Sequence, residues 1–422
     1  MSSNYINDFK DFVPFESPIY YSGPYWDNQE IDAAVKALTT GKWVSSGENV
    51  HKFEVRFSKK FNQKHSTMVN SGSSANLVMI GAIKKVLGWE DGDEIILSPV
   101  GFPTTIAPVV QHGLTPVFVD IEFETLNFDL NLIEEKITER TRAIFISPVL
   151  GNPPDFDRLL EIKSKYGIEL IMDNCDSLGS KWRGKFLTEY TIASSCSFYP
   201  AHHISTGEGG MVSSDNEEII TVARSLASWG RDCYCVGAAN LLPNGTCGKR
   251  FDKWLDHYDD PVDHKYVFNN MGYNLKPLDL QGAIGLAQLK KFDEIYEKRR
   301  KSKYELQGIL EENPEAYDLY VPNELDHAEV SWFGTPIVCN HKKTKTPLVR
   351  YFEEIKVQTR NYFAGNILLH SGYSHLDDYA KYPNANQVLD RVFFIGASPH
   401  YTQEVFSYIR QRLSERHLYF PL

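Results

Sequence analysis

The 422-residue sequence lacks several features that would mark particular classes of protein. It has no apolar run near the roughly 18 residues that a membrane-spanning helix needs, so an integral membrane protein is not expected. The formal net charge is −11, from 44 basic and 55 acidic residues, which argues against a nucleic-acid-binding surface. The first residues include acids and lack the apolar core of a signal peptide, and we therefore expect a cytoplasmic protein.

Cysteine is scarce as well, with six residues in the whole chain. In a reducing compartment such cysteines serve as ligands, reactive thiols or small buried side chains more often than as disulfides. The sequence also shows no internal repeat and no low-complexity segment.

What the sequence does contain is a regular alternation of strand and helix patterns in its first half. We expect strands at residues 67–69, 94–97, 116–120, 143–146 and 170–173. We expect helices at residues 30–38, 54–61, 76–86, 104–112, 132–137 and 156–166, and a long charged helix at 288–306. This order predicts an α/β fold with a mostly parallel sheet, whose ligands bind at the carboxyl ends of the strands. The length favours a large domain, residues 1–285, and a smaller α+β domain, residues 286–422.

Small residues follow the first expected strand, from Asn70 to Asn76. Gly72, Ser73 and Ser74 place backbone N–H groups and hydroxyls at a helix start, where the helix dipole favours an anion such as a phosphate. An ordinary serine N-cap is the alternative interpretation.

Asp173 ends a buried strand, and Phe102 lies in a loop after another strand. A carboxylate at the place of Asp173 could face the ring nitrogen of a pyridine cofactor and keep it protonated. Phe102 could stack on the same ring. The alternatives are a helix cap for Asp173 and a core position for Phe102.

Taken together and in this order, these segments resemble the sugar-nucleotide aminotransferase family of fold type I pyridoxal-phosphate proteins. The resemblance covers nearly the whole chain and rests on Gly23–Pro24, Asn70–Asn76, Val117–Asp120, Asp173, Gly207–Gly210 and Gly272–Leu275. It implies a seven-stranded-type sheet flanked by helices in the large domain, and a homodimer. Ser73 and Ser197 resemble phosphate contacts of the family, and Asn274 resembles the residue that reaches the phosphate of the neighbouring subunit. Asp176 departs from the family, because an amide or imidazole usually stands near the cofactor's ring hydroxyl.

The segment between Ser195 and Val212 contains no lysine. His202 stands where the aminotransferases carry the lysine that bonds to their cofactor. Histidine cannot form that lasting bond but can move protons, so the chain resembles the 3-dehydratases of this family. The resemblance implies pyridoxamine 5′-phosphate bound without a covalent link, with His202 as the catalytic base. His203 is the alternative base and a candidate substrate contact, and Lys181 is the nearest lysine for an aminotransferase.

The cysteines resemble those of the iron–sulfur branch of these dehydratases. Cys175, Cys233, Cys235 and Cys247 are implied as ligands of a [2Fe–2S] cluster, within a cysteine-rich loop at 233–250 for the last three. This branch takes electrons from a flavin iron–sulfur NAD(P)H-dependent reductase. A four-thiolate zinc site and four unrelated thiols are the alternatives. The stretch between Cys235 and Cys247 is longer than is usual in the family, and a flexible loop can absorb such a difference.

The implied substrate is a 4-keto-6-deoxy sugar nucleotide, CDP-linked, which loses its C3 hydroxyl in 3,6-dideoxysugar biosynthesis for a surface polysaccharide. Arg360, Asn361 and Asn366 resemble the loop that reaches the sugar or its diphosphate, and a solvated surface loop is the alternative. Three other functions stay open: a self-contained 3-dehydratase that regenerates its amine cofactor with glutamate, an aminotransferase, and a non-enzymatic family member.

Overall fold

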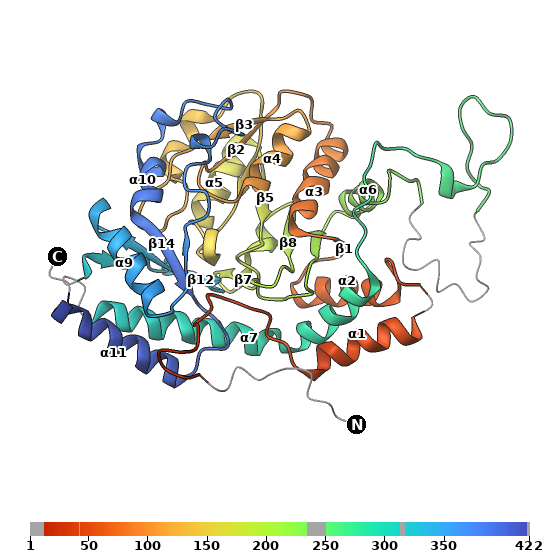
Figure 1. The fold of residues 1–422 in the computed structure, drawn as a ribbon. Helices are drawn as coiled ribbons and strands as arrows, with labels where there is room; N and C mark the ends of the chain where they lie inside the picture. Colours follow the sequence, from red (N-terminus) through yellow and green to blue (C-terminus); the bar gives the residue numbers. More distant parts are fainter. Residues whose placement is uncertain (1–11, 42, 234–249, 313–316, 420–422) are drawn as a thin grey trace.

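The computed structural model describes residues 12–41, 43–233, 250–312 and 317–419. Its centre is a seven-stranded sheet of order β1-β9-β8-β5-β4-β2-β3, in which β9 alone runs antiparallel to its neighbours (Figure 1). The strands are β1 (His65–Val69), β2 (Glu94–Leu97), β3 (Thr115–Phe118), β4 (Thr141–Ile146), β5 (Glu169–Asp173), β8 (Ala193–Ser197) and β9 (Gly210–Ser214). The expected mostly parallel sheet is therefore confirmed.

The central strands are buried on both faces, as the apolar character of their sequences requires. In β4, Ala143 and Phe145 point into one core, and Ile144 and Ile146 point into another. Successive side chains of a strand alternate between the two faces of a sheet, so one short apolar run supplies both cores.

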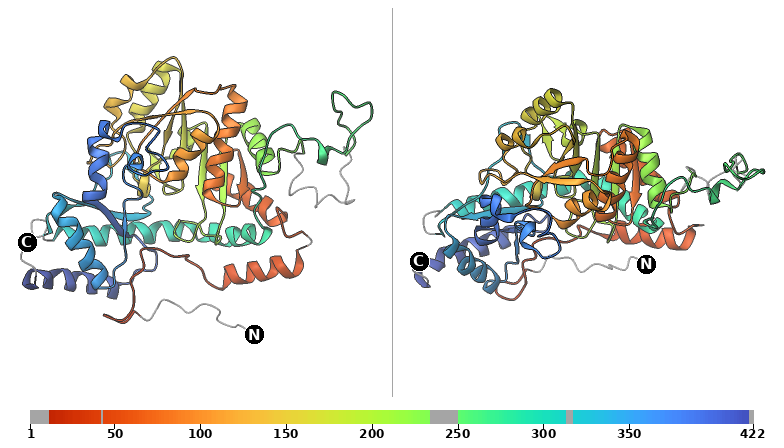
Figure 2. Two further views of the ribbon diagram at one scale, coloured as in Figure 1. Left: turned by 45° about the horizontal axis from the view of Figure 1, so that its top comes forward. Right: turned by 90° about the horizontal axis from the view of Figure 1, so that it is seen from above.

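Helices cover the two faces of the sheet (Figures 1 and 2). One face packs against α3 (Gly72–Leu87), α4 (Pro103–Gln111) and α6 (Glu217–Ala227). The other packs against α5 (Phe156–Tyr166), α2 (Glu48–Lys60) and the first half of α7 (Asp279–Glu311), with α1 (Asn28–Thr40) beside α7. Among the described residues, no helix combines the length and the apolar character needed to cross a bilayer.

A second, antiparallel sheet of order β10-β12-β14-β13 lies toward the C-terminus and has its own hydrophobic core. The elements of this region are β10 (Leu319–Tyr320), β12 (Gly334–Cys339), α9 (Lys342–Glu354), β13 (Thr359–Asn361), α10 (Pro383–Arg391), β14 (Val392–Gly396) and α11 (Gln403–Tyr419). A small third sheet joins β11 (Ala328–Glu329), β6 (Lys181–Trp182) and β7 (Lys185–Phe186). Short 3₁₀ turns are η1 (Leu130–Leu132), η2 (Glu134–Lys136), η3 (Val149–Gly151), η4 (Leu187–Tyr190), η6 (His264–Tyr266), η7 (Ile367–Leu369) and η8 (Tyr379–Lys381).

Three helix predictions differ most from the structure, and one of them, the helix expected at 54–61, is α2, which starts six residues earlier. The helix expected at 132–137 is wrong, because this stretch forms the two short turns η1 and η2. The helix expected at 288–306 is the middle of α7, which starts nine residues earlier. Gly282 and Gly285 lie inside it because a Cβ at Gly282 would be 2.4 Å from the backbone nitrogen of Val50, and one at Gly285 would be 2.6 Å from the Phe53 ring. The predicted domain boundary after residue 285 falls within α7, and the division into 1–285 and 286–422 stays a prediction.

Candidate active site

A cavity of about 430 Å³ opens at the carboxyl ends of β1, β5 and β8. Eight of the residues singled out from the sequence line it: Gly72, Ser73, Phe102, Asp173, Cys175, Asp176, Ser197 and His202. The sequence reasoning missed most of its aromatic wall, formed by Tyr21, Tyr199, Phe333 and Phe363. Tyr199 precedes His202 in the same loop and could have been found by its position. Phe363 lies within the predicted substrate loop between Arg360 and Asn366, whereas Phe333 comes from the C-terminal half and no local signal marks it.

The N-terminus of α3 forms one end of the cavity. The side chain of Ser71 caps this helix by accepting the N–H of Ser74 at 3.1 Å. The N–H groups of Gly72 and Ser73 belong to the first turn and have no acceptor within the helix. A Cβ on Gly72 would lie 2.4 Å from Cβ of Ser197, so glycine is needed for the start of α3 to pack closely against the end of β8. The geometry suits an anion such as a phosphate. Ser74 contacts Ser71 and does not line the cavity.

Asp173 ends β5 with a buried side chain that is held on several sides. Its Oδ2 accepts from Asn76 Nδ2 at 2.8 Å and from Thr105 Oγ1 at 2.7 Å, and its Oδ1 accepts the N–H of Cys175 at 3.2 Å. These donors fix the orientation of the carboxylate at the edge of the cavity. A pyridine ring nitrogen would find a rigid acceptor there.

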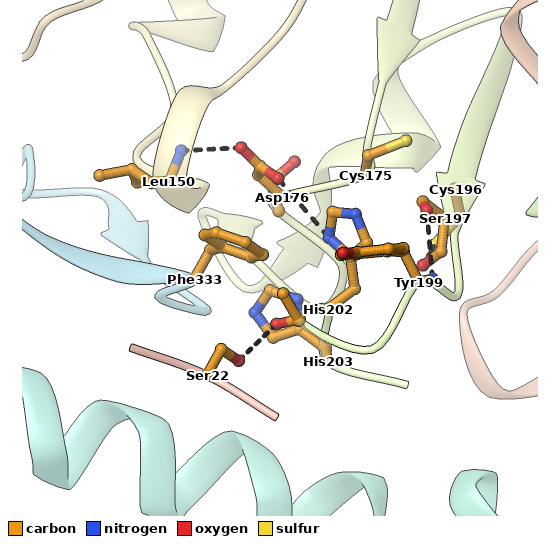
Figure 3. Close-up of polar contacts among 12 residues, drawn as sticks. Ser22, Leu150, Cys175, Asp176, Cys196, Ser197, Tyr199, His202, His203 and Phe333 are labelled. Carbon is orange, nitrogen blue, oxygen red and sulfur yellow. Dashed lines mark hydrogen bonds and ion pairs between the residues drawn. The ribbon is translucent and has the colours of Figure 1, made fainter. Parts of the chain in front are cut away.

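His202 and Asp176 lie side by side on the cavity wall, with Nδ1 of the imidazole 3.6 Å from Oδ1 of the carboxyl group (Figure 3). Both side chains are 14% exposed. Burial, with a smaller contribution from Arg299, lowers the pKa of His202 to about 3. Burial and the nearby Asp173 carboxylate raise the pKa of Asp176 to about 7. Near neutral pH the imidazole is therefore uncharged and has a nitrogen lone pair that can accept a proton.

The adjacent histidine points elsewhere (Figure 3). His203 is 1% exposed, its Nε2 lies 3.1 Å from the carbonyl oxygen of Ser331, and it does not line the cavity. The nearest lysine considered from the sequence, Lys181, lies in the small third sheet and pairs with Glu329 at 3.4 Å. Neither side chain lines the cavity, and the substrate contact of His203 stays a prediction.

The predicted substrate loop is only partly near the cavity. The guanidinium of Arg360 lies 4.3 Å from the ring centre of Tyr21, which lines the cavity. Asn361 is exposed and accepts from Lys345 at 3.1 Å. Asn366 is fully buried and accepts the N–H of Leu368 at 3.0 Å as the cap of η7. Arg360 is thus the one of the three that contacts the cavity wall directly, and the substrate roles stay predictions.

The predicted cluster ligands are only partly described. Cys175 lines the cavity, and burial, followed by the charge of Asp173, raises the pKa of its thiol. Cys233 is buried and follows α6 in the chain, whereas Cys235 and Cys247 lie outside the described residues. Asn274 is exposed, does not line the cavity and accepts from Lys276. The cluster and the cross-subunit role of Asn274 stay predictions.

Comparisons with known proteins agree with this geometry. The sequence pattern of the DegT/DnrJ/EryC1/StrS aminotransferase family matches residues 25–414. The dTDP-4-dehydro-2,6-dideoxy-D-glucose 3-dehydratase of Saccharopolyspora spinosa is 38% identical over 416 residues, which are 96% of this chain and 87% of that protein. The lipopolysaccharide biosynthesis protein RfbH of Salmonella typhimurium is 36% identical over 414 residues, which are 96% of this chain and 93% of that protein.

A solved structure extends the likeness to the fold. The Escherichia coli GDP-4-keto-6-deoxy-D-mannose-3-dehydratase with bound hydrated pyridoxal phosphate superimposes with a TM-score of 0.79 and 31% identity, covering 94% of this chain and 99% of that one. The seven-stranded sheet with its flanking helices and smaller antiparallel sheet is therefore the fold type I aminotransferase-like architecture expected from the sequence.

Proposed function

The chain belongs to the DegT/DnrJ/EryC1/StrS aminotransferase family, and from this premise we propose that it is a pyridoxamine-phosphate-dependent 3-dehydratase of sugar nucleotides in deoxysugar biosynthesis. More specifically, its substrate is a CDP-linked 4-keto-6-deoxy sugar, and its electrons pass through a [2Fe–2S] cluster from a flavin iron–sulfur reductase.

The observation that carries this proposal is the identity of the residue at the centre of the cavity. None of the described residues that line the cavity is a lysine, and His202 projects into it instead. An aminotransferase of this fold needs a lysine that bonds to its cofactor and transfers protons. Histidine can transfer protons but cannot form the lasting bond to the cofactor, which fits an enzyme that binds an amine cofactor without a covalent link.

The cavity has the groups that such a cofactor needs. The first N–H groups of α3 and the hydroxyls of Ser73 and Ser197 would hold the phosphate, and the fixed carboxylate of Asp173 would accept from the ring nitrogen. Phe102, half exposed at the rim, would cover one face of the ring. When bound, pyridoxamine phosphate supplies an amine that condenses with a ketone and a ring that withdraws electrons.

The neutral imidazole of His202 is the proton carrier of this site. It can accept a proton on a ring nitrogen and then donate it to a departing hydroxyl, so one side chain serves as base and acid in turn. The rings of Phe333, at 5.1 Å, and Tyr199, at 6.3 Å, flank the imidazole and limit the access of water to it. Uptake of two electrons, from the proposed reductase, and of two protons, from solvent, with loss of the C3 oxygen as water, would then give a 3-deoxy-4-keto sugar nucleotide.

Two further parts of the proposal concern partners. Cys175 lies on the cavity wall, two residues after Asp173, so a cluster that includes its sulfur would be close to the electron-withdrawing ring. For a homodimer, the support is the exposed position of Asn274 together with a surface segment rich in large exposed side chains. These side chains are Phe251, Trp254, Leu255, Tyr258, Tyr266 and Phe268, in a segment that extends from the body in Figure 1.

The experiment is to purify the protein without oxygen and to assay iron, acid-labile sulfide and zinc, with Cys175→Ala and Cys233→Ala beside a Cys339→Ala control from the C-terminal core. About two irons and two sulfides per chain, lost in the first two variants only, are expected for the cluster. The same protein is then offered CDP-, dTDP- and GDP-linked 4-keto-6-deoxy sugars with a reductase or with glutamate. Turnover with glutamate and no reductase, in protein free of iron, would establish the self-contained dehydratase instead.

A further inference from the structure

Arg299 lies on α7 beneath the loop that carries His202, and its side chain is 1% exposed. Its Nη2 donates to the carbonyl oxygens of Ala201 at 2.8 Å and His202 at 3.1 Å. Its Nη1 donates to the carbonyl oxygen of Phe333 at 3.1 Å. One guanidinium therefore joins the histidine loop to the chain that enters β12, although these two segments are far apart in the sequence.

The second of these segments leads back to the cavity. The N–H of Phe333 donates to the carbonyl oxygen of Leu150 at 2.9 Å, and the N–H of Leu150 donates to Oδ2 of Asp176 at 3.2 Å. The other oxygen of Asp176 lies 3.6 Å from the His202 ring. Arg299 thus closes a ring of contacts in which the backbone of His202 and the carboxyl group facing its imidazole are both held.

Burying the Arg299 guanidinium at this place costs desolvation free energy. The hydrogen-bond acceptors of Arg299 are backbone carbonyls and the hydroxyl of Ser22, at 3.2 Å. The Asp176 carboxyl group interacts with the guanidinium electrostatically but is not one of its hydrogen-bond acceptors. Burial lowers the pKa of Arg299 to about 10, which shows how unfavourable the environment is for a cation. An aliphatic side chain would avoid this desolvation cost but could not bind several oxygens at fixed angles.

We propose that Arg299 is the positioning residue of the catalytic loop: it holds the His202 backbone and the Phe333–Leu150–Asp176 segment at one separation, so that the imidazole stays aligned in the cavity. This inference rests on the proposed role of His202 as proton carrier. Its physical basis is that a proton-transfer group displaced by about 1 Å can lose about a hundredfold in rate.

The test compares Arg299→Lys with Arg300→Lys. Lysine keeps the charge but cannot bind several carbonyls with a planar fork. Arg300 is the matched control, because it is the next residue on the same helix and also donates to a backbone carbonyl, that of Val330, at 2.9 Å. Neither Arg300 nor Val330 lines the cavity. In Arg299→Lys we expect kcat to fall by about 10- to 100-fold, with KM and the Kd of pyridoxamine phosphate within about threefold of wild type. Arg300→Lys should keep the wild-type kcat.

A second readout needs no cofactor or substrate. In protein with ¹⁵N-labelled histidine, the ring resonances of His202 are those that disappear in His202→Asn. We expect Arg299→Lys to move these resonances and to leave most of the other histidines, of which the chain has thirteen in all, in place. Arg300→Lys should leave the His202 resonances in place. A general loss of structure would move the resonances of all the histidines.

A milder variant covers the case in which Arg299→Lys does not fold. Ser22→Ala removes one acceptor of Arg299 and the hydroxyl that donates to the Ala201 carbonyl at 2.7 Å, and we expect about a threefold loss of kcat. Wild-type kcat with unmoved His202 resonances in the folded variant would overturn the inference, as would equal losses in Arg299→Lys and Arg300→Lys. Retained dehydratase activity in His202→Asn would instead overturn the proposed function.

Discussion

Nδ1 of His202 and Oδ1 of Asp176 lie 3.6 Å apart, and burial acts on the two groups in opposite directions. It lowers the pKa of the imidazole to about 3 and raises that of the carboxyl group to about 7. Two groups that would form an ion pair in water therefore meet with the imidazole uncharged. A neutral imidazole is the form that can accept a proton, but the same burial makes His202 a weaker base than a free histidine, whose pKa lies nearer to neutral pH.

The first prediction concerns the two adjacent histidines. His202→Asn removes the proton acceptor from the cavity, and we expect kcat to fall by about 10²- to 10⁴-fold in a turnover assay. His203→Asn removes a contact to the Ser331 carbonyl outside the cavity, so it should lower the free energy of unfolding by about 1–2 kcal/mol and leave kcat within about threefold. Equal losses of kcat in both variants would contradict this assignment.

The second prediction concerns the phosphate end of the cavity. In Gly72→Ala the new methyl group would lie 2.4 Å from Cβ of Ser197, so Ser197 and the start of α3 must move apart, which displaces the groups that would hold the phosphate. We expect the Kd of pyridoxamine phosphate, measured by calorimetry, to rise by at least about tenfold, or roughly 1.4 kcal/mol. Gly372→Ala is the control, because no heavy atom lies within 4 Å of its new Cβ, and its Kd should equal that of the wild type.

The third prediction concerns the strand-end carboxylate. Asp173→Asn keeps a side chain of the same shape between Asn76 and Thr105 but removes the negative charge that would keep the ring nitrogen protonated. We expect kcat to fall by about a hundredfold or more, with the unfolding midpoint changed little. Asp157→Asn, on the surface of α5 beside Arg183, should leave kcat unchanged. Wild-type turnover in Asp173→Asn would exclude a role for this charge.

The fourth prediction concerns pH and a second buried cation of α7. Lys303 is 1% exposed, and burial lowers its pKa in the folded protein from 10.5 to about 8. Between these two pH values the unfolded chain binds one more proton at this site than the folded chain does, so the free energy of unfolding rises with pH. Relative to Lys303→Met, the wild type should gain roughly 3 kcal/mol from pH 8 to 10.5 in urea titrations. A constant difference between the two proteins across that range would refute the shift.

The strand-end part of the site could be predicted because its signals are local in the sequence. Asp173 is the last residue of an apolar strand, and Gly72 and Ser73 follow another, so the sheet brings them to one edge. Residue spacing alone could not show which of the adjacent residues His202 and His203 points into the cavity. Only the packed loop shows that one ring enters the cavity and that the other binds the Ser331 carbonyl.

The remaining parts depend on contacts between distant segments. Phe333 and Arg299 reach the cavity region through tertiary packing, and neither belongs to a motif that a local pattern would reveal. Asn366 is also placed by tertiary structure, since it is buried as the cap of η7, and its substrate role stays a prediction. The domain boundary predicted after residue 285 falls inside α7, where Gly285 is needed because the helix passes close to Phe53.

The path of α7 has a consequence for how activity is lost. Its first half packs through Phe292 into the core beneath the large sheet, and its second half packs through Leu306 into the C-terminal core. Arg299 lies between these two anchors and holds the His202 loop. Partial melting of either core would free the helix and with it the loop, so catalysis depends on the cooperative integrity of both cores, and inactivation by denaturant should coincide with the unfolding of whichever core is the less stable.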